Sequence, residues 1–172
     1  IVMTHQSIYL VGLMAVGKST VGKLLAERLN RPFFDSDKEI EKKAGAEISW
    51  IFDVEGEEGF RDREEQVICE LTKVPGVVVA TGGGVVERES NRRRISAGGL
   101  VLHLDCPNKT LIKRVRKDNK RPLLQRSNVD EVLVELKNRR DPLYQEIATH
   151  RFVTDGQSTN ALVNVIIDKL NQ

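Results

Sequence analysis

The sequence predicts an α/β protein built on a parallel β-sheet that helices cover on both faces. Short apolar runs alternate with segments of helical periodicity along the whole chain of 172 residues. These runs contain almost no polar residues, as expected for strands that are buried on both faces. No repeat, low-complexity tract or linker rich in Pro, Gly or Ser interrupts the alternation, so a single domain over residues 1–172 is predicted.

Glycine and proline residues end most of the expected elements in the first half of the chain. Gly12 ends the first strand, and Gly45 closes a helix. In order, we expect a strand over 8–11, a helix over 20–29, a short strand at 33–34, helices over 37–43 and 57–72, and a strand over 77–80.

The second half continues the alternation. We expect a helix over 88–97, a strand over 100–104, helices over 111–115 and 131–138, a strand at 152–153, and a helix over 161–170. Ligands of such folds bind beyond the carboxyl ends of the strands. Glycine-rich and acidic segments follow three of the predicted strands, so we expect them to lie on one rim of the sheet.

Charge is distributed unevenly along the chain, although the net charge is only +2. Residues 35–65 contain 12 acidic and 5 basic side chains, whereas residues 88–126 contain 12 basic and 3 acidic ones. The basic stretch contains no aromatic residue on which nucleic-acid bases could stack, so we expect no nucleic-acid partner. A small polyanion is compatible with this stretch.

Two cysteines, Cys69 and Cys106, are too few for a disulfide framework or a four-cysteine zinc site. Both lie among apolar neighbours, which favours reduced thiols in a reducing compartment. No apolar run approaches the length of a membrane span, and residues 1–6 show no basic region followed by an apolar stretch. We therefore expect a cytoplasmic protein with no membrane partner.

A phosphate-binding loop is predicted where the first strand meets the first helix. The segment from Gly12 to Ser19 fits G-x-x-x-x-G-K-[ST] in the strand-to-helix context that this motif requires. Its backbone N–H groups and the helix N-terminus favour an anion. Lys18 would reach the β- and γ-phosphates, and Ser19 would offer a hydroxyl ligand to Mg²⁺. A tight turn alone would explain Gly12 and Gly17, but it gives no reason for Lys18 and Ser19.

Two aspartates compete for the role of the carboxylate that supports Mg²⁺. Asp105 ends the apolar run 100–104, as such acidic residues usually do, although His103 breaks the pattern. Asp35 follows Phe34 and belongs to an acidic pair with Asp37. Helix N-capping is an alternative role for Asp35 or Asp37. Spacing alone leaves the choice between Asp35 and Asp105 open.

Six motifs, in register from about residue 7 to residue 170, resemble those of shikimate kinases. They are Lys18-Ser19-Thr20, Asp35-Ser36-Asp37, the segment 59–64 (GFRDRE), the segment 80–84 (ATGGG), the segment 121–124 (RPLL) and the segment 140–144 (RDPLY). One departure is Ala15, where the family often carries glycine in the phosphate loop.

The resemblance implies ATP-dependent phosphorylation of the 3-hydroxyl of shikimate, in the pathway to chorismate and the aromatic amino acids. It also implies the P-loop kinase fold, a five-stranded parallel sheet like that of nucleoside monophosphate kinases with a mobile lid, and a monomer. In this resemblance Asp35 supports Mg²⁺ through water. Asp37 holds the shikimate hydroxyls and can accept a proton from the attacking one.

An arginine clamp for the carboxylate of shikimate also follows from the resemblance, with Arg61 and Arg140 as its members. The spacing of the last motif selects Arg140 over Arg139. A surface ion pair with Glu57 or Glu65 is the alternative role of Arg61. Gly82, Gly83 and Gly84 would allow close approach of the substrate ring, with Gly83 as the nearest contact.

Contacts to ATP complete the implied site. A lid over about 116–128 would bring Arg121 over the phosphates, where its charge supports the transition state. Arg114 corresponds to the residue that lies against the adenine, and Gln157 is a further candidate at that end. Around the phosphates the resemblance places Gly12, Ala15, Val16, Gly17, Lys18, Ser19 and Thr20. Lys18, Asp37 and Arg121 are the expected catalytic residues.

Two other functions compete with this expectation. A kinase of another small metabolite or of a nucleoside monophosphate would share the fold and the phosphate loop. A nucleotide-gated binding module would lack catalysis, but such a module does not need the acceptor site that Asp35, Asp37 and a basic lid provide.

Overall fold

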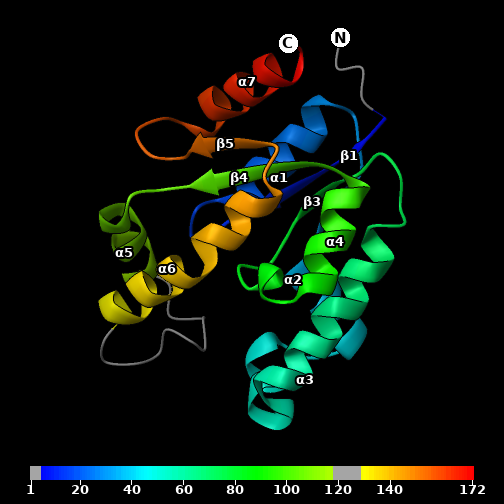
Figure 1. Ribbon diagram of the computed structural model, residues 1–172, viewed down its shortest axis with the longest axis vertical. Helices are drawn as coiled ribbons and strands as arrows, with labels where there is room; N and C mark the ends of the chain where they lie inside the picture. Colours follow the sequence, from blue (N-terminus) through cyan, green and yellow to red (C-terminus); the bar gives the residue numbers. More distant parts are fainter. Residues whose placement is uncertain (1–4, 118–128) are drawn as a thin grey trace.

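Five parallel strands form the sheet, in the order β2-β3-β1-β4-β5 (Figure 1). The computed structural model describes residues 5–117 and 129–172. The strands are β1 (Ser7–Val11), β2 (Phe33–Asp35), β3 (Val78–Ala80), β4 (Gly99–Asp105) and β5 (His150–Val153). The predicted α/β class and the five-stranded parallel sheet are confirmed, and each strand lies where an apolar run was expected.

Helices flank this sheet on both faces, and their positions follow from side-chain alternation along β1. Leu10 and Tyr9 are neighbours in β1, so their side chains point to opposite faces of the sheet. Gly22 of α1 lies against Leu10 and Gly98 of α4 lies against Tyr9, so the two helices cover opposite faces. The helices are α1 (Lys18–Arg28), α2 (Ser36–Ala44), α3 (Ile48–Leu71), the 3-10 turn η1 (Val85–Glu87), α4 (Glu89–Gly98), α5 (Asn108–Arg116), α6 (Val129–Ile147) and α7 (Thr159–Leu170). α7 packs beside α1, and α6 packs beside α4.

Two helices, α3 and α6, extend farthest beyond the ranges that the sequence pattern predicts. α3 begins at Ile48, nine residues before the predicted start, and Gly56 breaks it with φ 74° and ψ 178°. The part after Gly56 corresponds to the predicted helix 57–72, whereas the part before it was missed. α6 continues through Pro142 to Ile147, although the prediction ended at residue 138. Proline commonly ends a helix, which is why the pattern stopped short.

The centre of the sheet is apolar, and its carboxyl edge is polar. β1 is buried along its whole length, and Val101, Leu102 and Leu104 of β4 are buried beside it. In the described ranges no helix combines the length and the apolar character that a membrane crossing requires. Of the predicted lid over 116–128, only residues 116 and 117 belong to the described part of the chain.

Candidate active site

The phosphate loop leaves the end of β1 and enters the N-terminus of α1. Gly12 has φ 150°, and a Cβ at this position would lie 2.3 Å from the carbonyl oxygen of Leu104, so no side chain fits there. Gly17 caps α1 with φ 98°. Both glycines of the motif therefore occupy conformations that L-residues rarely adopt.

Ala15 adopts a left-handed conformation with φ 65° in the same loop. A Cβ in this region costs about 1–2 kcal/mol, which explains why glycine is common at the equivalent position of related loops. The Arg114 guanidinium donates a hydrogen bond of 3.0 Å to the Ala15 carbonyl. Arg114 thus lies against the phosphate loop, and its contact with the adenine stays a prediction.

Lys18 and Ser19 point in different directions at the start of α1. The Lys18 side chain is 8% exposed, and its ammonium donates to the carbonyls of Gly12 (2.5 Å) and Leu13 (2.8 Å). The Ser19 hydroxyl is exposed and donates to the Asp35 carboxylate. The loop therefore presents a cation on its inner side and an oxygen pair, Ser19 with Asp35, at its rim.

Asp35 caps α2, so the capping role that the sequence offered for Asp35 or Asp37 belongs to Asp35. Its Oδ1 accepts hydrogen bonds from the backbone N–H groups of Asp37 (3.0 Å) and Lys38 (3.3 Å), while Oδ2 accepts from Ser19. The cap fixes the orientation of the carboxylate beside the phosphate loop.

Asp105, the competing carboxylate, is already occupied. Its oxygens accept hydrogen bonds from Lys137 (2.7 Å), Arg151 (2.6 Å) and the N–H of Cys106 (2.8 Å). Burial opposes ionisation of Asp105, but the hydrogen bonds from Lys137 and Arg151 outweigh it and lower its pKa to about 2. This pairing favours Asp35 as the carboxylate of a metal site.

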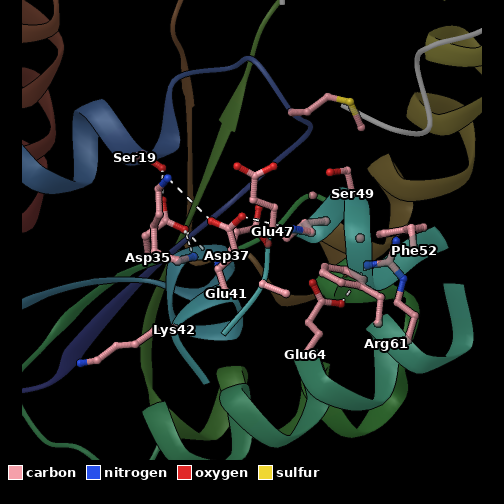
Figure 2. Close-up of a pocket in the computed structure, with 18 of the residues that line it drawn as sticks. Ser19, Asp35, Asp37, Glu41, Lys42, Glu47, Ser49, Phe52, Arg61 and Glu64 are labelled. Atoms are coloured by element: carbon pink, nitrogen blue, oxygen red, sulfur yellow. Dashed lines mark hydrogen bonds and ion pairs between the residues drawn. The ribbon is translucent and has the colours of Figure 1, made fainter. Parts of the chain in front are cut away.

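A cavity of about 950 Å³ lies beyond the carboxyl edge of the sheet, between α2, α3 and the glycines that follow β3. Figure 2 shows Ser19, Asp35 and Asp37 on one side of this cavity and Phe52, Arg61 and Glu64 on the other. Gly82, Gly83, Gly84 and Arg140 also line it. The expected substrate residues from four separate segments are therefore brought together.

Asp37 and Glu64 share the space above Gly82. A Cβ on Gly82 would lie 2.7 Å from Asp37 Oδ1 and 2.8 Å from Glu64 Oε2, so only glycine leaves room for both carboxylates. Glu64 is 1% exposed. Burial raises its pKa to about 7, Arg61 opposes this shift, and the charge of Asp37 adds to it.

The two predicted clamp arginines are buried, and both lie next to Glu87. Arg61 donates to Glu64 Oε1 (2.9 Å) and lies 3.7 Å from Glu87 Oε2. Arg140 donates to the same Glu87 oxygen at 3.0 Å. Arg61 also forms the alternative ion pair, with Glu57 at 3.6 Å. Because Arg61 is nevertheless buried and lines the cavity, this pair does not account for its position.

Close packing accounts for the other two glycines of the run. A Cβ on Gly84 would lie 2.4 Å from Arg61 Nη2, and one on Gly83 would lie 3.3 Å from Arg140 Nη1. Gly83 and Gly84 thus leave space for the side chains of Arg140 and Arg61, in addition to any role in turning the chain.

The remaining predicted ATP contacts are Arg121, Gln157, Val16 and Thr20. Arg121 lies outside the described residues. Gln157 is exposed in the turn after β5, where its amide donates to the Val153 carbonyl (3.0 Å). Val16 is buried and Thr20 is exposed at the start of α1.

Sequence reasoning did not single out several residues around this site, among them Glu64, Phe52 and Glu87. Glu64 was detectable, since it follows Arg61 by three positions on one helix and such residues are neighbours. Phe52, whose ring lies 4.8 Å from that of Phe60, belongs to the missed half of α3. Glu87 has no local signal, because only the folded chain brings η1 to α3 and α6.

Comparison with known proteins agrees with this geometry. Residues 14–171 match the family model of shikimate kinase. Shikimate kinase 1 of Erwinia tasmaniensis is 51% identical over 168 residues, covering 97% of both chains, and that of Yersinia enterocolitica is 52% identical over 166 residues, covering 96% of both. The shikimate kinase from Acinetobacter baumannii, solved in complex with shikimate, has a TM-score of 0.94 and 44% identity, covering 96% of this chain and 93% of that one.

With a family match over almost the whole chain and half of the residues identical to those of curated relatives, the phosphate loop and the arginine-lined cavity have a common explanation. The chain belongs to the shikimate kinase family, whose activity is the ATP-dependent phosphorylation of shikimate on the route to the aromatic amino acids.

Proposed function

We propose that shikimate binds in the cavity between α2 and α3 and that its 3-hydroxyl attacks the γ-phosphate of ATP held by the phosphate loop. One observation carries the assignment. Two buried arginines, Arg61 and Arg140, line the same cavity as the Asp37 carboxylate and the exposed end of the phosphate loop at Ser19. A substrate with a carboxylate at one end and hydroxyls at the other fits this distribution of charge.

Arg61 and Arg140 bind the carboxylate of shikimate in this proposal. The planar guanidinium matches a carboxylate through two parallel hydrogen bonds. Arg140 Nε and Glu64 Oε2 are buried and have no hydrogen-bond partner within the described ranges. Unpaired buried groups beside a cavity are expected where a ligand or water completes the network.

Asp37 accepts a hydrogen bond from the attacking hydroxyl and orients it toward the phosphate. Glu64 stands across Gly82 from it and keeps Arg61 in place through their hydrogen bond of 2.9 Å. The carboxylates and the arginines thus fix the two ends of the substrate.

Lys18 and the loop N–H groups bind the phosphates. Because the Lys18 ammonium now donates to the Gly12 and Leu13 carbonyls, nucleotide binding exchanges part of this contact for the β- and γ-phosphate oxygens. The roles of Arg114 and Gln157 at the adenine, and of Arg121 in a lid, are proposed from the family resemblance. All these groups belong to one chain, so we propose a monomer as the working unit.

A magnesium ion fits the oxygen pair formed by Ser19 and Asp35, because hydroxyl and carboxylate oxygens are the ligands that Mg²⁺ prefers. The hydrogen bond between the two side chains keeps both oxygens at the rim of the phosphate loop. When bound, the ion neutralises charge on the transferred phosphate. Asp105 is excluded from this role because Lys137 and Arg151 neutralise it.

The test is ADP release from MgATP with and without shikimate, beside quinate, gluconate and AMP. We expect strong stimulation by shikimate alone, abolished by EDTA. Stimulation by another acceptor would retain the phosphate loop and refute the assignment of the clamp. Binding of ATP without stimulation by any acceptor would indicate a nucleotide-gated binding module.

A further inference from the structure

Tyr144 connects α6 to the glycine run that lines the cavity. The residue is fully buried, and its hydroxyl donates a hydrogen bond to the Gly83 carbonyl. It lies four positions after Arg140, so both side chains project from the same face of α6. α6 therefore carries both Arg140 and the Tyr144 hydroxyl, which holds the loop of glycines after β3.

Gly83 itself lies between the clamp and the phosphate loop. A Cβ on Gly83 would be 3.3 Å from Arg140 Nη1, 3.3 Å from the backbone nitrogen of Met14 and 3.7 Å from the Gly12 carbonyl oxygen. The two contacts of 3.3 Å are closer than ordinary van der Waals contact, so Gly83 fits closely against Arg140 and the phosphate loop. A small displacement of Gly83 would therefore change the position of Arg140 or of the phosphate loop.

The ring of Tyr144 is held from the other side by His103 of β4. The ring centroids lie 5.1 Å apart with an interplanar angle of 37°. Burial raises the pKa of Tyr144 well above its ordinary value, although Arg140 opposes the shift, and burial lowers the pKa of His103 against the charge of Asp105. Tyr144 thus remains a hydrogen-bond donor, and His103 a neutral ring, near neutral pH.

We propose that Tyr144 is a positioning residue for the acid substrate: by holding the Gly83 carbonyl, its hydroxyl fixes the gap between Gly83 and the Arg140 guanidinium before shikimate binds. The inference rests on the proposed function, because it assigns Arg140 to the substrate carboxylate. Tyr144 is buried behind Gly83 and acts through Gly83 and Arg140.

The test compares Tyr144→Phe with the wild type in steady-state kinetics. The phenyl ring keeps the contact with His103 and removes only the hydroxyl. We expect the KM for shikimate to rise about tenfold, the effect of losing about 1.4 kcal/mol, with the KM for ATP unchanged within about twofold. Tyr9→Phe is the matched control, since Tyr9 is equally buried but its hydroxyl lies beside Gly98 at the opposite edge of the sheet. This control should leave both KM values unchanged.

A double variant separates positioning from a general loss of stability. In an Arg140→Ala background, Tyr144→Phe should raise the KM for shikimate less than about twofold, because the two residues act on one interaction. Gly83→Ala, which places a methyl group against Arg140, should reproduce the rise in the KM for shikimate and serves if Tyr144→Phe does not fold.

Two results would refute the inference, and a third would refute the proposed function. An unchanged KM for shikimate in Tyr144→Phe, with only a lower urea midpoint, refutes the inference and leaves Tyr144 a structural residue. An unchanged KM for shikimate in Gly83→Ala refutes it as well. Absence of shikimate-dependent turnover in the wild type refutes the proposed function instead.

Discussion

Ala15 carries a side chain at a left-handed position of the phosphate loop (φ 65°). A Cβ in this conformation costs about 1–2 kcal/mol, whereas glycine in its place costs about 0.4–1 kcal/mol through the larger entropy of the unfolded chain. The first effect outweighs the second, so the loop retains strain at the residue whose carbonyl Arg114 binds.

Ala15→Gly should therefore raise the free energy of unfolding by about 0.5–1 kcal/mol. Urea unfolding measures this change. Ala97→Gly is the matched control, because Ala97 is exposed in the right-handed helix α4, where glycine destabilises by about 0.5–1 kcal/mol. A lower free energy of unfolding in both variants would contradict backbone strain at Ala15.

Lys18 is the second residue for which we predict the size of a mutational effect, here on the rate of catalysis. In the proposed function Lys18 supplies a preorganised cation to the transferring phosphate, so Lys18→Ala should raise the barrier by about 3–4 kcal/mol, a loss of a hundredfold or more in kcat. Steady-state kinetics at saturating MgATP and shikimate measure this loss. Lys23→Ala, an exposed lysine of the same helix, should leave kcat unchanged. Near-normal turnover of Lys18→Ala would contradict the role of the loop.

At the scale of elements, the break in α3 shapes the cavity. Gly56 adopts φ 74° and ψ 178°, a region essentially restricted to glycine. The break redirects the chain between Phe52 on one part of α3 and Phe60 and Arg61 on the other, so that all three line one cavity. The shape of this side of the cavity thus depends on the backbone conformation of Gly56.

Gly56→Ala should lower the free energy of unfolding by about 1–3 kcal/mol and weaken shikimate binding more than ATP binding. Titration of each ligand, together with urea unfolding, tests both parts. Val54→Ala, at an exposed position on the same part of α3, should change neither affinity. Equal weakening of both ligands would indicate that the break supports the fold as a whole.

Local sequence signals predicted the strands and the phosphate loop because each of these features is determined by contiguous residues. The alternation of apolar runs placed β1 and β4 within a residue or two, and the motif placed Lys18 and Ser19 at the start of α1. The first part of α3 was missed although Ile48, Ile51 and Phe52 have helical spacing, and α6 was shortened because Pro142 argues against a helix. Contacts between distant segments, such as Glu87 with Arg140, have no local signal.

For the molecule as a whole, Glu64 links stability to pH. Its pKa is about 7 in the folded protein against an ordinary value of 4.5, because burial disfavours the charged form. Between these values the native state retains a proton that the unfolded state releases, so the free energy of unfolding falls as the pH rises. The loss amounts to about 3 kcal/mol, and it is complete above pH 7.

Glu64→Gln should remove this decline, so the stability of the variant relative to the wild type should increase between pH 5 and pH 8. Urea unfolding across this range is the measurement. Glu131→Gln, an exposed glutamate of α6, should follow the wild-type profile. Parallel profiles for the wild type and Glu64→Gln would show that Glu64 ionises normally in the folded protein.

Under the proposed function, Glu87 has a consequence for the thermodynamics of shikimate binding. Its carboxylate already lies 3.0 Å from Arg140 and 3.7 Å from Arg61, so the protein offers these arginines the same functional group that the substrate carries. When shikimate binds, its carboxylate takes a place beside arginines that Glu87 already neutralises. Few counterions are therefore released. We expect the dissociation constant for shikimate to change little between low and moderate salt, which calorimetric titrations can measure. Selection among organic acids would then depend on the shape of the ring and on its hydroxyls, because charge alone is already balanced by the protein.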